Sequence, residues 1–241
     1  MKILTWIFCG LVLLLVLWIL YIYYKISVSK DIVARTSPFT IPGEDYTNTL
    51  LVLGDSTAVG VGASIPSDSI AGQLAAYTKA TYVENYAVSG SVVADLQQQI
   101  NLTTRKKYDR ILVQIGANDM VAFHTPEKVA EELKNILVPL SEKTTHLIFI
   151  SAGNLGGAPL IPFFLRPLYT KLNLRYHEEF ESIGKLNGIT YINMYTPPQE
   201  DPFILDPKNY FVEDDFHPSS LGYKAWFIRI QEKLILDNKK Q

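Results

Sequence analysis

A serine and a histidine that lie far apart in the chain have the surroundings that hydrolytic chemistry needs. Ser56 follows an apolar run at residues 50–53 that ends in Gly54. A short apolar run ended by glycine is typical of a buried strand followed by a sharp turn. Ser56 is therefore expected at the carboxyl end of a strand, where open α/β sheets bind ligands. The plainer interpretation is that Gly-Asp-Ser only forms a turn.

His217 is the best candidate for the base that a serine nucleophile requires. It lies in a polar segment that ends at Pro218, a residue that suits the first turn of a helix. Asp214 stands three positions earlier, and a tight turn would bring its carboxylate to the imidazole Nδ1. That contact would fix the histidine tautomer and stabilise the imidazolium form. The alternative is a solvated acidic loop in which Asp214 and Asp215 have no catalytic role.

Three groups could stabilise the oxyanion that forms when an ester carbonyl is attacked. They are the backbone N–H of Ser56, the backbone N–H of Gly90 and the side-chain amide of Asn118. Losing one such donor typically costs about 10²–10³ in rate. Taken singly, Gly90 could be a turn glycine and Asn118 a helix cap, so the hypothesis depends on the residues occurring together in this order.

Apolar runs alternate with amphipathic segments along the rest of the chain, which predicts βαβ units and an α/β fold with a parallel sheet. We expect five strands, at residues 49–53, 81–87, 110–115, 146–151 and 190–194. We expect helices at residues 69–79, 92–100, 126–140, 169–186 and 219–236, with a proline-rich loop at 195–212. In a parallel sheet, the residues that follow the strands meet at one edge.

The N-terminal segment differs from the rest of the chain. Residues 3–24 carry no charge, and this run is long enough to span a bilayer as a helix. Aromatic residues crowd its far end, as they do at membrane interfaces. A cleaved signal peptide and a buried core helix are the alternatives, but the sequence Tyr-Ile-Tyr-Tyr-Lys at the end of the run is a poor cleavage site. We expect a single-pass anchor at residues 1–26, a linker at 27–48 and one domain at 49–241, with the domain on the extracytoplasmic side.

Composition narrows the function further. The net charge is −2, so the chain offers no electrostatic support for binding nucleic acid. Cys9 is the only cysteine and lies in the membrane run, which excludes an intrachain disulfide and a cysteine metal cluster. His124, His146 and His177 are scattered without metal-ligand spacing. Neither a metal nor a cofactor is expected.

Taken together, these blocks resemble those of the SGNH or GDSL-type hydrolases. The matching stretches, in chain order, are Gly54-Asp55-Ser56, Asn85-Tyr86-Ala87-Val88-Ser89-Gly90, Gly116-Ala117-Asn118-Asp119 and Asp214-Asp215-Phe216-His217-Pro218. Thr57 departs from the leucine in the family name, at a position that commonly varies. The resemblance covers the whole domain after the linker.

The resemblance implies a flavodoxin-like three-layer fold and a serine esterase or lipase that works through an acyl-enzyme. It implies that Ser56 is the nucleophile, that His217 and Asp214 complete the triad, and that Gly90 and Asn118 donate to the oxyanion. No metal is implied. We expect an esterase for carboxylic esters of small molecules or lipids; the alternatives are an O-acetyl esterase for envelope glycans and a catalytically silent, anchored binding module.

One apolar segment could decide which substrate is used. Residues 153–168 follow the fourth expected strand, on the same edge as Ser56, and include Phe163 and Phe164. We expect these two residues either to form a wall of the acyl pocket or to dip into the membrane surface. A loop that only packs against the core is the plainer alternative.

Overall fold

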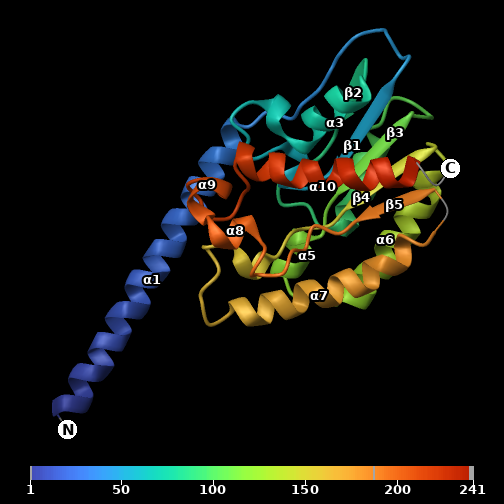
Figure 1. The fold of residues 1–241 in the computed structure, drawn as a ribbon. Coiled ribbons are helices and arrows are strands. Elements are labelled where there is room, and N and C mark those ends of the chain that lie inside the picture. Colours follow the sequence, from blue (N-terminus) through green and yellow to red (C-terminus); the bar gives the residue numbers. More distant parts are fainter. Residues whose placement is uncertain (1, 187, 239–241) are drawn as a thin grey trace.

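The computed structural model describes residues 2–186 and 188–238. The structure does not describe Met1, which belongs to the expected anchor, or Asn187 and residues 239–241, which belong to the expected domain. A five-stranded parallel sheet has the order β2-β1-β3-β4-β5, the flavodoxin-like order (Figure 1). Its strands are β1 (Thr49–Gly54), β2 (Tyr82–Asn85), β3 (Arg110–Gln114), β4 (His146–Ile150) and β5 (Ile189–Ile192). The predicted α/β fold with five parallel strands is confirmed.

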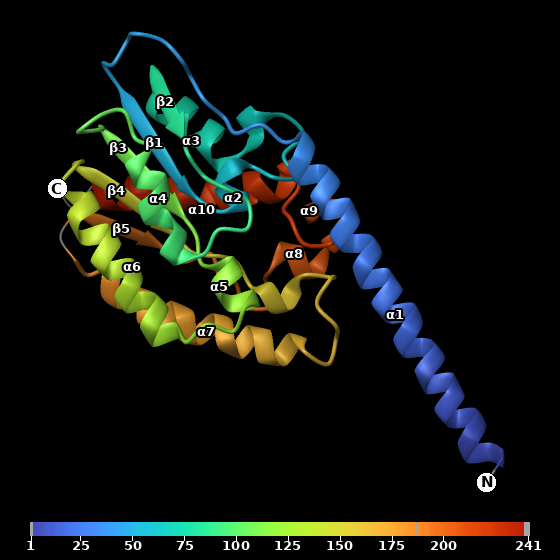
Figure 2. The same cartoon turned by 180° about the vertical axis from the view of Figure 1, so that it is seen from behind.

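Every residue of β1 is buried, because helices cover both faces of the sheet. Side chains alternate along a strand, so Leu50 and Val52 enter one core and Leu51 and Leu53 enter the other. The helices that pack on the first face are α3 (Ile70–Thr78) and α10 (Ser220–Asn238); those on the second are α4 (Leu96–Asn101), α6 (Pro126–Ser141) and α7 (Arg166–Ile183) (Figures 1 and 2). The result is a three-layer sandwich.

Several short helices lie where the sequence suggested turns or loops. They are α2 (Ser56–Val59), α5 (Ala117–Val121), α8 (Pro202–Leu205) and α9 (Pro207–Tyr210), together with the 3-10 turns η1 (Pro66–Asp68) and η3 (Leu155–Gly157). A further 3-10 turn, η2 (Val93–Asp95), occupies the first part of the helix expected at residues 92–100. The expected proline-rich loop at 195–212 therefore contains two helical turns. Each of these two begins with proline, whose fixed φ suits the first position of a helix.

The N-terminal helix α1 (Lys2–Arg35) is longer than the expected anchor. Residues 27–35, which were expected to belong to a linker, continue the same helix. Leu4–Arg35 is long and apolar enough to cross a membrane, by length and composition. The apolar half projects away from the domain, whereas the other end runs along it (Figures 1 and 2). There Ile32 is buried against Val59 and Val61.

Candidate active site

The turn after β1 places Ser56 at the start of α2. Gly54 has a φ of +143°, and a side chain there would collide with the backbone carbonyl of Gln114 on the adjacent strand β3. Asp55 then caps α2, because its carboxylate accepts from the backbone N–H and the hydroxyl of Thr57. Burial raises the pKa of Asp55 to about 6. The strand, the glycine and the cap together hold Ser56 in one position.

His217 reaches Ser56 from the loop between α9 and α10. The imidazole Nε2 lies 2.9 Å from the Ser56 Oγ, and Nδ1 lies 2.6 Å from Asp214 Oδ2. All three residues are buried. Because an ionised carboxylate can only accept, the Nδ1 proton faces Asp214, and Nε2 is free to accept from the serine hydroxyl. The contacts expected from the sequence among Ser56, His217 and Asp214 are present.

Asp214 also holds the loop that carries the histidine. Its Oδ1 accepts from the backbone N–H groups of Phe216 and His217, each at 2.9 Å. Burial acts to raise the pKa of Asp214, but the hydrogen bonds and the charge of His217, with the two backbone N–H groups, lower it overall. Asp214 is therefore an anion at neutral pH and keeps the imidazole in the required tautomer.

Asn118 lies at the second position of α5, beside the serine. Its amide nitrogen donates to the Ser91 carbonyl at 2.8 Å, which orients the side chain and leaves the second amide hydrogen available. Ser56, Asn118 and His217 line the same cavity. The Ser56 N–H is at the first position of α2, so it has no carbonyl partner within that helix.

Gly90 is the one candidate oxyanion donor that does not line the cavity with Ser56. It is exposed and has a φ of +88°. It immediately precedes Ser91, whose carbonyl holds Asn118. The structure thus connects Gly90 to the site through its neighbour, and its role as a donor stays a prediction.

The cavity beside Ser56 is small, with a volume of about 50 Å³. For comparison, a cavity of about 150 Å³ holds a benzene molecule. Its lining is mainly apolar and aromatic. Besides Ser56, Asn118 and His217, the cavity is lined by Thr57, Ala117, Ala152, Gly153, Asn154, Leu155, Ala158, Met194, Asp201, Phe203, Phe211, Phe216, Pro218 and Trp226.

Phe163 and Phe164 do not line this cavity, so the expected pocket wall is not formed by their side chains. They lie at the tip of the segment between η3 and α7 and are 80% and 62% exposed. Their rings contact each other, and Phe164 also faces Trp18 of α1, with ring centroids 6.5 Å apart. The segment does contribute Leu155 and Ala158 to the cavity.

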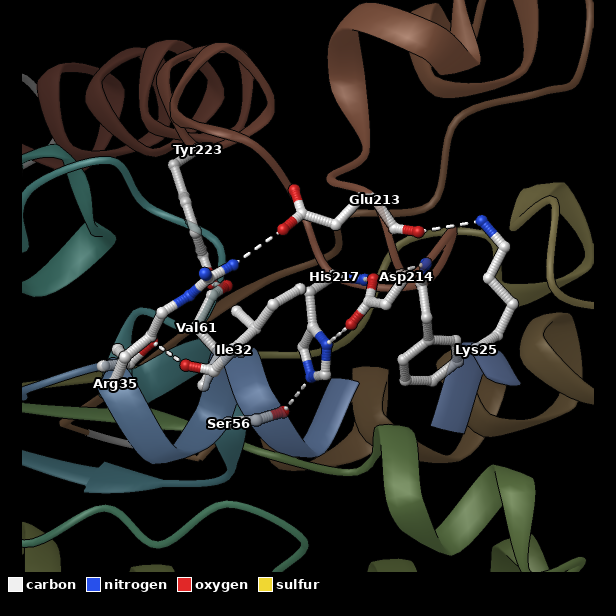
Figure 3. A network of polar contacts seen from close by, with 11 residues as sticks. Lys25, Ile32, Arg35, Ser56, Val61, Glu213, Asp214, His217 and Tyr223 are labelled. Carbon is white, nitrogen blue, oxygen red and sulfur yellow. Dashed lines mark hydrogen bonds and ion pairs between the residues drawn. The ribbon is translucent and has the colours of Figure 1, made fainter. Parts of the chain in front are cut away.

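The N-terminal helix contacts the loop that carries the triad acid, which was not predicted from the sequence. Lys25 forms an ion pair with Asp215 and donates to the Glu213 carbonyl, and Tyr21 donates to Asp215. Figure 3 shows that Lys25 and Arg35, which lies further along α1, both reach Glu213. Glu213 is next to the hydrogen-bonded chain of Asp214, His217 and Ser56. A feature of the sequence that could have indicated this contact is that Lys25 is the first charged residue after the apolar run.

The chain belongs to the GDSL-like lipase/acylhydrolase family, whose model matches residues 52–225. This range includes Ser56, Asn118, Asp214 and His217. The membership supports hydrolase activity of the esterase and lipase kind. No curated protein matches the chain.

Solved structures share the fold at low sequence identity. A member of the lipolytic G-D-S-L family from Veillonella parvula is 16% identical with a TM-score of 0.60, covering 77% of this chain and 97% of its own. An acetylxylan esterase from Geobacillus stearothermophilus is 17% identical with a TM-score of 0.52, covering 78% and 94%. An extracellular lipase from Streptomyces rimosus is 14% identical with a TM-score of 0.55, covering 78% and 100%.

Proposed function

We propose that the protein is a membrane-anchored serine esterase that hydrolyses carboxylic esters through an acyl-enzyme. The observation that carries this proposal is the continuous hydrogen-bonded chain from Ser56 through His217 to Asp214. That chain is the arrangement a serine nucleophile needs, because the base accepts the hydroxyl proton while the carboxylate stabilises the resulting imidazolium.

The reaction would proceed in two balanced steps. Ser56 Oγ attacks the ester carbonyl carbon as its proton passes to His217 Nε2, and the amide of Asn118 and the Ser56 N–H donate to the oxyanion. When the C–O bond breaks, His217 protonates the leaving alcohol and Ser56 stays acylated. Water then attacks the acyl-enzyme with His217 again accepting the proton, which releases the carboxylic acid and the free serine.

The size of the cavity favours a short acyl group in the position next to Ser56. A volume of about 50 Å³ leaves room for an acetyl-sized group, whereas a long acyl chain would have to extend out through the open side of the cavity. This observation also favours the second candidate, an O-acetyl esterase for envelope glycans. The structural similarity to an acetylxylan esterase is consistent with it, although at 17% identity that similarity establishes the fold alone.

The proposal includes membrane anchoring through residues 3–24, with the domain on the extracytoplasmic side. Within residues 4–24 every large apolar side chain except Ile22 is exposed, and none of the 18-residue apolar window is buried. A bilayer would cover them, and about 20 apolar residues are enough to cross its hydrocarbon core. The partner of the domain itself would be the ester, and nucleic acid is not expected to bind.

The decisive test is hydrolysis of p-nitrophenyl acetate, butyrate and octanoate by the full chain in detergent, beside Ser56→Ala. We expect turnover that falls with acyl length and is lost in Ser56→Ala by about 10³-fold or more. Asn101→Ala, on the exposed end of α4, is the matched control and should keep the parent rate. A folded parent protein with no turnover on these esters or on acetylated glycan would instead support a silent binding module.

A further inference from the structure

The anchor helix fixes the height of the catalytic loop relative to the bilayer. Tyr21 and Lys25 both bond Asp215, the neighbour of the triad residue Asp214. Lys25 is also the first charged residue after the apolar run. A lysine at the end of a membrane span places its charge at the interface, so with the proposed anchor in a bilayer the loop with Asp214 and His217 would lie at headgroup level.

A second segment of the domain lies deeper than this loop. We call residues 159–165, which connect η3 to α7, the apolar tip. Phe164 in the tip faces Trp18, which stands seven residues before Lys25 in the same helix. At 1.5 Å per residue, Trp18 lies about 10 Å further along the helix towards the bilayer centre. The tip is therefore on the membrane side of the first charge.

The tip has the composition of a segment that is covered by lipid. Phe163 is more exposed than any other large apolar side chain that the structure describes, at 80%. Segments that lie in the membrane interface bury apolar side chains about 5–10 Å into the headgroup and acyl boundary. The depth given by Trp18 matches that range, so a bilayer around α1 would cover Phe163 and Phe164.

The tip is also connected to the cavity beside Ser56. Ile161 of the tip packs in an apolar cluster with Ala158 and Tyr169, against Leu155, Leu165, Phe211 and Phe216. Four members of this cluster, Leu155, Ala158, Phe211 and Phe216, also line the cavity. The segment that carries the exposed phenylalanines thus also supplies Ile161 to the apolar cluster that packs behind the cavity.

We infer that the apolar tip is a second contact with the bilayer that holds α1, and that the site takes esters carried in that bilayer. This inference rests on the proposed anchor and esterase activity and adds the substrate class: amphiphilic esters whose short acyl group enters the cavity while their apolar part stays in the membrane. Esters dissolved in water would not be held next to the site by the membrane in this way.

The depth of the tip can be measured on the full chain in phosphatidylcholine vesicles. In a Cys9→Ala background, single cysteines at Phe163, Leu14 and Leu102 are labelled with a polarity-sensitive fluorophore. Leu14 lies in the middle of the apolar run, and Leu102 is an exposed residue beyond α4, before β3 begins. Nitroxide-labelled lipids and aqueous iodide then quench each label.

We expect lipid quenching and protection from iodide at Phe163→Cys and Leu14→Cys, and the reverse at Leu102→Cys. A label at position 163 that behaves like the one at 102, while that at 14 is in lipid, would overturn the inference and leave the anchor intact. A label at position 14 that iodide quenches would show that the anchor itself has failed.

The substrate class needs a separate measurement. The double variant Phe163→Ser/Phe164→Ser is compared with the parent on water-soluble p-nitrophenyl butyrate and on an acetylated diacylglycerol embedded in the vesicles. We expect the ratio of the bilayer rate to the soluble rate to fall about tenfold, because the two aromatic side chains proposed to contact lipid are lost. An unchanged ratio would refute the route from the bilayer, and a parent inactive on both esters would refute the proposed function instead.

Discussion

At the scale of single residues, Asp214 combines two tasks that are often divided between residues. One carboxylate oxygen orients the His217 ring, and the other accepts from two backbone N–H groups of its own turn. The Asp-x-x-His spacing made the first contact predictable, because a tight turn brings positions three apart together. The second contact needs φ and ψ values that the sequence does not reveal, including a left-handed Asp215 with φ of +62°.

Asn118 and Gly90 show where prediction from the sequence reaches its limit. Both follow strands, so their arrival at one edge of a parallel sheet could be predicted. Which polar atoms face the cavity could not, since that depends on side-chain rotamers and on the Ser91 carbonyl that holds Asn118. Phe163 and Phe164 were placed on the correct edge, but the length of their loop carries them past the cavity.

His177 gives a prediction for stability against pH. Its Nδ1 lies 2.6 Å from the Tyr191 hydroxyl, and burial, followed by the charge of Arg229, lowers the pKa of His177 to about 4. Between the ordinary value of 6.5 and about 4, the unfolded chain binds the proton more tightly. The free energy of unfolding should therefore fall as pH falls through this window, by about 2–3 kcal/mol at pH 4.5.

Urea denaturation of the parent and of His177→Gln at pH 7.5 and 4.5 measures this contribution. The variant should be less stable at pH 7.5 but should lose less stability on acidification. Asn101→Ala, which removes no titratable group from the exposed end of α4, is the control and should keep the pH dependence of the parent. Equal losses in the parent and in His177→Gln would contradict the assignment.

At the scale of elements, helices that pack on the sheet were predictable and the shortest ones were not. Residues 126–140 have apolar side chains at helical spacing, and α6 occupies Pro126–Ser141. By contrast, α2 and α5 have four and five residues, too few for a period to be recognised. The extension of α1 had a signal, since no glycine or proline stands between Lys25 and Pro38, and Val28 and Ile32 are four apart.

The contact of α1 with the catalytic loop predicts an effect of Lys25 on turnover. Replacing Lys25 with Gln removes the charge that holds Asp215, whose side chain is 28% exposed. We expect kcat for p-nitrophenyl acetate to fall about three- to tenfold with KM little changed, because a looser loop orients His217 less well. Lys25→Arg should restore most of the rate.

Arg35→Gln is the matched control for this prediction. Its ion pair with Glu213 joins the same helix to the same loop, but both side chains are more than 60% exposed. Exposed pairs contribute about 0–1 kcal/mol, so kcat should stay near the parent value. Equal kcat values for Lys25→Gln and Arg35→Gln would show that the Lys25 contact has no special influence on the loop.

At the scale of the whole molecule, the end of α1 packs as part of the domain. Ile32 is buried among Val59 and Val61, next to α2. A chain of residues 36–241 would expose these residues, at a cost of about 2 kcal/mol, and its Tm should fall by about 4–8 °C. A chain of residues 21–241 keeps these contacts, so in detergent its Tm should match that of the full chain. Equal Tm values for the two truncated chains would contradict this account.

The unbroken passage of α1 into the domain also limits how far the enzyme can reach. A flexible tether of about 20 residues would let the site explore roughly 25 Å around its attachment point. Here the helix is continuous through Arg35 and Ile32 near its end is buried against the domain, so the proposed membrane anchor would leave no slack between membrane and domain. As the protein diffuses laterally in the membrane, its active site would stay within a thin layer near the lipid surface. Esters held tens of ångströms above that surface would have to move down to reach the active site.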